Sequence, residues 1–229
     1  MSTNHINLYW LLSSHIFGLF PVVITYLEFK KYKHYQSLYM FFNYLSSILF
    51  SILYHTKDYN EINEPIQSTN DLWILLDHWS SSNSIVLTSI YVMSLKTEIF
   101  YSYAYFINIL LLIIQILNNH ISSFVTIFTA LFICLVRYKI IFKFLCMFPR
   151  QSILTILFTC FAVVCFFVGL SNNYELWHSL WHFCIFISAG LSCKLRLSLY
   201  QTYYLNRDRD RDIESTEMRA YSRTTSTSI

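Results

Sequence analysis

The stretch that decides the fold is residues 99–117, IFYSYAYFINILLLIIQIL, which carries no charged side chain. A helix needs about 20 mostly apolar residues to cross the hydrocarbon core of a bilayer, and this segment meets that requirement. Segments of the same character fill most of the chain before residue 200. They are approximately Leu8–Leu27, Leu38–Tyr54, Leu72–Leu95, Ile99–Leu117, Ile121–Tyr138, Ser152–Leu170 and Leu176–Leu197. The sequence therefore predicts an all-α polytopic membrane protein, a bundle of seven transmembrane helices.

The amino-acid composition supports the same class. Charged residues make up 13% of the chain, apolar residues 55% and aromatic residues 19%, whereas a typical soluble domain is about 25% charged. A soluble fold would lack the surface charge that keeps it in solution, and a disordered chain would be far more hydrophilic. The net charge is only +3 and no basic stripe is interleaved with aromatic residues, so nucleic acid is not an expected partner.

The loops between these segments differ strongly in their content of lysine and arginine. The side that holds the amino terminus carries Lys57 alone, and the other side carries the remaining basic residues of the chain. Because basic loops stay in the cytosol, we expect the amino terminus outside or in the lumen and the carboxyl terminus in the cytosol.

The end of the chain has a different composition. Residues 207–212 alternate arginine and aspartate, and a segment rich in serine and threonine follows. Such a sequence cannot bury enough apolar surface to fold alone. We therefore expect a seven-helix transmembrane domain over residues 1–200 and a disordered cytosolic tail over 201–229.

Ionisable side chains inside a membrane are costly and need a partner or a role. With the expected topology, the second segment runs outward and ends near His55. The third runs inward, which places Asp77 about one turn below its outer end. The seventh also runs inward and carries His178 and His182 in its first two turns. These side chains are thus predicted to lie at one depth, near the outer leaflet.

The spacing of these residues suggests a metal site. His178 and His182 are four residues apart, so both imidazoles leave the same helix face and can bind one zinc ion. Three histidine ligands leave the fourth position of zinc for water, which is typical of catalytic zinc. Asp77 then suits a nearby carboxylate or general base. Ser51, one turn from His55, suits a hydrogen-bond donor to the substrate oxygen or the water.

Less specific interpretations exist for each of these groups. The paired histidines of the last segment are also explained as a polar pair among the lipid headgroups. His55 and Asp77 would serve equally in a simple interhelical hydrogen bond. We interpret His15, in the middle of the first segment, as a packing residue, and His78 as an interface residue.

The same residues resemble a known pattern. Seven-helix membrane hydrolases related to alkaline ceramidases and adiponectin receptors carry SxxxH in helix two, aspartate in helix three and HxxxH in helix seven. Here those motifs are 51-SILYH-55, Asp77 and 178-HSLWH-182. Their local sequence is similar to the branch that contains myomaker and the post-GPI-attachment lipases (transmembrane protein 8), over about residues 8 to 200. The resemblance implies zinc on His55, His178 and His182, with Ser51 and Asp77 close by.

Two functions are therefore expected. The first is a zinc-dependent lipid hydrolase, phospholipase A2-like or ceramidase-like, that cleaves an acyl ester or amide, including the lipid of a GPI anchor. The second is a myomaker-like factor for membrane remodelling or cell–cell fusion, in which zinc is structural. Membrane lipids are the expected partners in both, and a homo-oligomer is compatible with the sequence. The expected location is the plasma membrane, with the Golgi or endoplasmic reticulum as alternatives.

Overall fold

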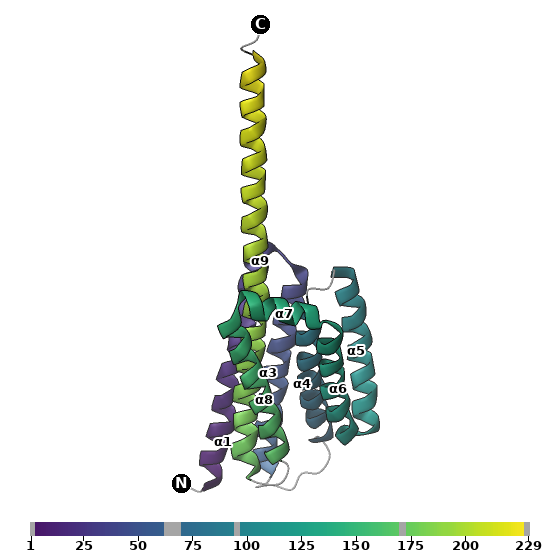
Figure 1. The fold of residues 1–229 in the computed structure, drawn as a ribbon. Helices are drawn as coiled ribbons and strands as arrows, with labels where there is room; N and C mark the ends of the chain where they lie inside the picture. Colours follow the sequence, from purple (N-terminus) through teal and green to yellow (C-terminus); the bar gives the residue numbers. More distant parts are fainter. Residues whose placement is uncertain (1–2, 62–69, 94–96, 170–172, 227–229) are drawn as a thin grey trace. The chain divides into compact units, whose positions relative to one another are not determined.

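The computed structural model describes residues 3–61, 70–93, 97–169 and 173–226, and almost all of them are helical. The all-α class is therefore confirmed. The elements in chain order are α1 (Thr3–Ser14), the 3-10 helix η1 (His15–Gly18), α2 (Leu19–Tyr32), α3 (Tyr35–Glu61), α4 (Asn70–Val92), α5 (Thr97–Leu117), α6 (Asn119–Val136), α7 (Tyr138–Met147), α8 (Pro149–Gly169) and α9 (Tyr174–Ser226) (Figure 1).

The chain divides into two compact units, Met1–Leu195 and Arg196–Ile229. The first unit holds α1 to α8 and the first part of α9. The second unit is helical as far as Ser226, and within it the guanidinium of Arg196 donates a hydrogen bond to the Tyr200 hydroxyl. The expected division into a transmembrane domain over 1–200 and a cytosolic tail over 201–229 stays a prediction.

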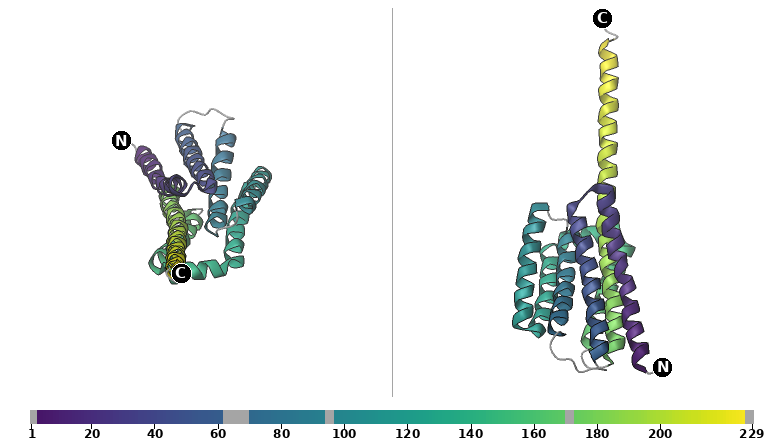
Figure 2. Two further views of the ribbon diagram at one scale, coloured as in Figure 1. Left: turned by 90° about the horizontal axis from the view of Figure 1, so that it is seen from above. Right: turned by 180° about the vertical axis from the view of Figure 1, so that it is seen from behind.

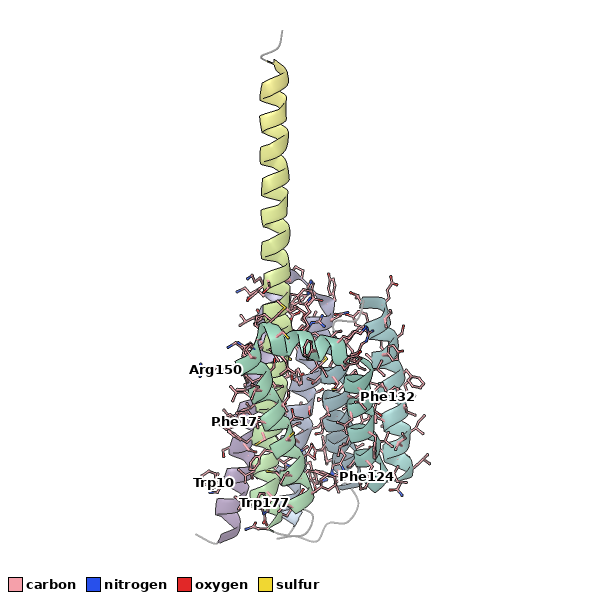
Figure 3. All side chains as sticks on the ribbon, in the orientation of Figure 1. Trp10, Phe17, Phe124, Phe132, Arg150 and Trp177 are labelled. Atoms are coloured by element: carbon pink, nitrogen blue, oxygen red, sulfur yellow. The ribbon has the colours of Figure 1, made fainter. Side chains whose placement is uncertain are left out.

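Several helices are suited to a membrane. Within the described residues, five segments are long and apolar enough to span a bilayer: Tyr9–Tyr32, Tyr35–Lys57, Thr97–Leu117, Pro149–Gly169 and Tyr174–Thr202. The pair α6–α7, bent by 73°, makes a sixth if it is counted as one span. Large apolar side chains also cover the outer faces of the helices, among them Trp10, Phe124 and Phe132 (Figure 3). A surface of this kind fits lipid rather than water, so the chain is an integral membrane protein.

Helix α4, which corresponds to the expected third span, is not among these apolar segments. Its Asp77 and Asn83 are buried, as are Ser80, Ser82 and Ser84. The helix packs against α3, α5 and α6, so neighbouring helices cover these polar side chains (Figure 2). A helix enclosed by protein needs less apolar sequence than one that faces lipid, which explains why α4 differs in composition.

The first span is interrupted where it passes α3. Pro21 has no amide proton to donate to the carbonyl one turn earlier, and the preceding residues His15–Gly18 form a 3-10 turn between α1 and α2. Gly18 lies against α3, because a Cβ atom there would meet Ile48 at 2.7 Å. This close approach brings the His15 ring next to α3.

Gly190 allows a similar approach between α9 and α2. A Cβ atom at this position would lie 2.1 Å from the Phe20 ring, whereas one at Gly169 would meet its nearest neighbour, Trp177, at 3.2 Å. We expect Gly190→Ala to lower the melting temperature of the detergent-solubilised protein by roughly 5 °C, because overpacking costs about 1–3 kcal/mol. Gly169→Ala is the control and should have a much smaller effect. Equal melting of the two variants would contradict this account of the α2–α9 contact.

Candidate metal centre

Four imidazoles meet inside the first unit, and we call them the histidine cluster. His15 comes from η1, His55 from α3, and His178 and His182 from the first turns of α9. The ring centroids are 4.3 Å apart for His15 and His182, 4.6 Å for His178 and His182, and 5.0 Å for His55 and His178. His15, His55 and His182 are almost completely buried. The cluster therefore joins segments that are far apart in sequence.

The ring nitrogens point toward one another. The Nε2 atom of His178 lies 3.3 Å from that of His55 and 3.1 Å from that of His182. Two nitrogens bound to one tetrahedral zinc ion are separated by about 3.3 Å, since each Zn–N bond is about 2.0–2.1 Å long. The ligand atoms of His15, His55 and His182 also lie within 4.8 Å of one another. The cluster is therefore able to bind a metal ion.

The environment of His182 fits a metal ligand. A neutral imidazole carries one proton, so mutual hydrogen bonds cannot satisfy three Nε2 atoms that converge on one point. A cation at that point would use all the lone pairs together, which a set of neutral donors in a buried site suits well.

His15 is held in one orientation by its helix. Its Nδ1 atom lies 2.9 Å from the carbonyl oxygen of Leu11, and a carbonyl only accepts, so Nδ1 carries the proton. The Nε2 atom of the neutral ring is then an acceptor, and the Ser51 hydroxyl lies 2.9 Å from it. A backbone carbonyl that fixes the ring tautomer in this way is typical of histidines at metal centres.

Asp77 on α4 lies beside the histidine cluster. Its carboxylate is within hydrogen-bonding reach of the Ser51 and Ser81 hydroxyls. Its Oδ1 atom is buried and has no partner among the described residues. Ser51 thus stands between two acceptors, the carboxylate of Asp77 and the Nε2 atom of His15. The single Ser51 proton can be donated to only one of these acceptors at a time, and both lie beside the histidine cluster.

The structure brings together all the residues that the sequence indicates as site residues. His55, His178 and His182 share the histidine cluster, and Ser51 and Asp77 adjoin it. His15, interpreted from the sequence as a packing residue, also belongs to the cluster. The only sequence signal for a role of His15 in the site was an imidazole inside an apolar segment. No polar residue lies three or four positions from it to form a second pattern.

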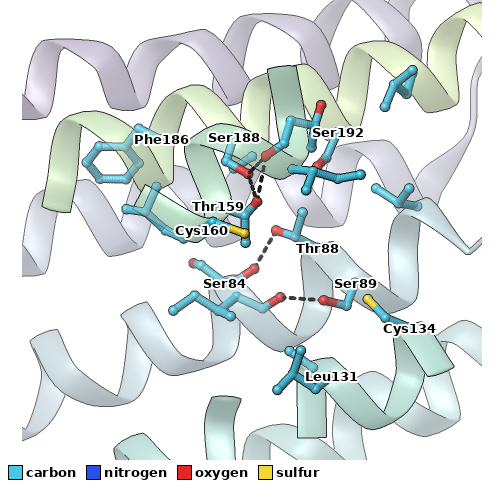
Figure 4. Close-up of a pocket in the computed structure, with 18 of the residues that line it drawn as sticks. Ser84, Thr88, Ser89, Leu131, Cys134, Thr159, Cys160, Phe186, Ser188 and Ser192 are labelled. Carbon is cyan, nitrogen blue, oxygen red and sulfur yellow. Dashed lines mark hydrogen bonds between the residues drawn. The ribbon is translucent and has the colours of Figure 1, made fainter. Parts of the chain in front are cut away.

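A cavity of about 450 Å³ adjoins the cluster, with His182 in its wall. It lies between α4, α6, α7, α8 and α9 (Figure 4). Many hydroxyl groups line it, and several of them bond to their own helices or to each other, whereas the buried Ser152 hydroxyl has no partner among the described residues. Ser89 donates to the Ile85 carbonyl, and the Thr159 and Ser188 hydroxyls are bonded together. The surface that lines the cavity is almost entirely apolar.

Comparison with known proteins assigns the chain to a family. A family described as "Protein of unknown function (DUF3522)" matches residues 4–183. The chain belongs to this family. No protein with a curated description matches it. The residues that the family covers include all four members of the histidine cluster, together with Ser51 and Asp77. The match therefore covers the whole candidate centre, and its description assigns no chemistry to it.

Proposed function

We propose that this protein is a zinc-dependent intramembrane lipid hydrolase that cleaves an acyl ester or amide, with the lipid of a GPI anchor among its candidate substrates. The observation that carries the proposal is the position of His182. This residue belongs to the histidine cluster and also lines the apolar cavity. A site of this kind can hold an acyl chain with its ester or amide next to a metal ion.

Each residue in or beside the cluster would have its own role in hydrolysis. Imidazoles of the cluster hold the metal, which when bound supplies a Lewis acid and a water of lowered pKa. Asp77 takes a proton from the attacking water and returns it to the leaving group. Ser81 orients the Asp77 carboxylate, and Ser51, whose hydroxyl donates to His15 at 2.9 Å, can accept a hydrogen bond from Asp77 once that carboxyl carries the proton.

The proposal includes a membrane topology. Helix α4 would cross the bilayer as a seventh span, shielded by α3, α5 and α6. The asymmetry of lysine and arginine supports an amino terminus outside or in the lumen and a cytosolic carboxyl terminus. The histidine cluster would then lie toward the outer leaflet. The plasma membrane is the proposed location, with lipids as the partners.

Hydrolysis is tested with two variants that leave the imidazoles intact. The purified protein is incubated with a phospholipid, a ceramide and a GPI-anchored lipid, and released fatty acid is measured by mass spectrometry. We expect Ser51→Ala and Asp77→Asn to reduce the rate at least about 100-fold, because Asp77 transfers the proton and Ser51 positions its carboxyl group. Zinc content should remain at the native level in both. Native rates in both variants, or no release by the native protein from any lipid, would overturn the proposal.

A second function is favoured by the number of imidazoles. Four protein ligands close the coordination of zinc, and closed sites are structural. The cluster offers four histidines: the ligand atoms of His15, His55 and His182 lie within 4.8 Å of one another, and His178 lies next to His55 and His182. In that case zinc would hold η1, α3 and α9 together in a myomaker-like factor for membrane remodelling or fusion. Loss of any histidine would then lower the amount of folded protein, and Asp77→Asn would leave the function unchanged.

A further inference from the structure

The cavity beside the histidine cluster has two chemically different ends. Trp181 and His182 lie at one end, and Leu195 lines the other on the same helix. At about 1.5 Å per residue, the distance along α9 from Trp181 to Leu195 is about 21 Å. One leaflet of the hydrocarbon core is only about 15 Å thick, so the cavity is deep enough for a long acyl chain.

Helix α7 forms part of the cavity wall. It follows α6 after a bend of 73° and lies across the ends of neighbouring helices (Figure 1). Ile141 and Phe144, three residues apart and therefore on one face, both line the cavity. Lys139 and Lys143 are exposed. This distribution is typical of a helix at the membrane interface, with its apolar face turned inward.

Phe144 is the largest side chain that α7 contributes to the cavity, and it is 4% exposed. We propose that Phe144 sets the maximum length of the acyl chain that the cavity accepts. The inference rests on the proposed function, since it takes the occupant to be the acyl chain of the substrate lipid. The methyl end of the chain would stop against the Phe144 ring while the ester or amide stays beside His182.

The test measures binding and not catalysis. The protein is purified in detergent with its metal, and saturated fatty acids of increasing length compete for it with a fluorescent fatty acid. Affinity for the native protein should rise about fourfold for each added methylene until the chain meets Phe144, and then stop rising. Phe144→Ala should extend the rise by roughly two to four carbons, the space of the removed ring. Phe144→Trp should end it earlier.

Phe142→Ala is the matched control, because Phe142 lies on the same helix and is 66% exposed. It should keep the native length profile. Identical profiles for the native protein and both Phe144 variants would overturn the role of Phe144 and leave the proposed hydrolase standing. If the native protein binds no fatty acid of any length, the acyl cavity and this inference both fail. Because Phe144→Trp fills the cavity rather than emptying it, the test stands even if Phe144→Ala does not fold.

Discussion

Replacing His55 and His182 together by alanine should remove the metal from the purified protein. These two residues are common to both sets of ligands that the geometry allows, the set with His178 and the set with His15. Two remaining imidazoles would bind a divalent ion far more weakly, so we expect about one zinc per chain in the native protein and almost none in the variant. Elemental mass spectrometry of detergent-purified samples measures this directly.

The control is His78→Ala. His78 lies on α4 next to Asp77, its ring centroid is 6.5 Å from that of Tyr54, and it is not one of the residues whose ligand atoms converge. Its replacement should leave the zinc content unchanged. A native protein that is well folded and contains no zinc, even after incubation with the ion, would contradict the metal centre. The four imidazoles would then be a set of polar interhelical contacts.

The second large effect is expected at His15, which separates the two proposed functions. If His15 acts by orienting Ser51, His15→Gln should lower kcat about 10–100-fold, with KM and zinc content near their native values. The reason is that a glutamine amide is not fixed by the Leu11 carbonyl as the imidazole is, so the acceptor that faces the Ser51 hydroxyl is no longer held in place, while His55, His178 and His182 still hold the ion.

Loss of zinc from His15→Gln would have a different meaning. It would show that His15 is a ligand together with His55 and His182. If His178→Gln also loses zinc, the site is a closed set of four imidazoles, which favours the structural function. A matched His78→Gln variant reports any general effect of exchanging histidine for glutamine. Unchanged kcat together with unchanged zinc would assign His15 to packing alone.

Much of the site could be predicted from the sequence because it depends on helical spacing and membrane depth. The i, i+4 pairs place Ser51 with His55 and His178 with His182, and the expected topology places Asp77 at the same level. The sequence did not indicate His15 as a site residue, because its position depends on a break in the first span. A 3-10 turn and the small Gly18 bring its ring to α3, and both are effects of packing.

The fold was predictable to a similar extent. Apolar segments identified the helices, yet the expected fifth segment, 121–138, is followed by α7, which the sequence pattern did not indicate. The chain turns at Arg137 and continues as a short helix with lysines on one side and Phe144 on the other. An amphipathic segment of this length has no clear signal beside long apolar spans, because its inward face is short and its polar face resembles a loop.

The histidine cluster has a consequence for how the protein is made. Two of its members, His15 and His55, belong to early helices, and the other two, His178 and His182, belong to α9. A nascent chain that has not yet inserted its last helix presents only the first two imidazoles, which are too few to retain an ion. A metal ion bound as proposed would therefore be loaded only after α9 has been inserted. The metal content of a newly made molecule would then report whether its biogenesis is complete.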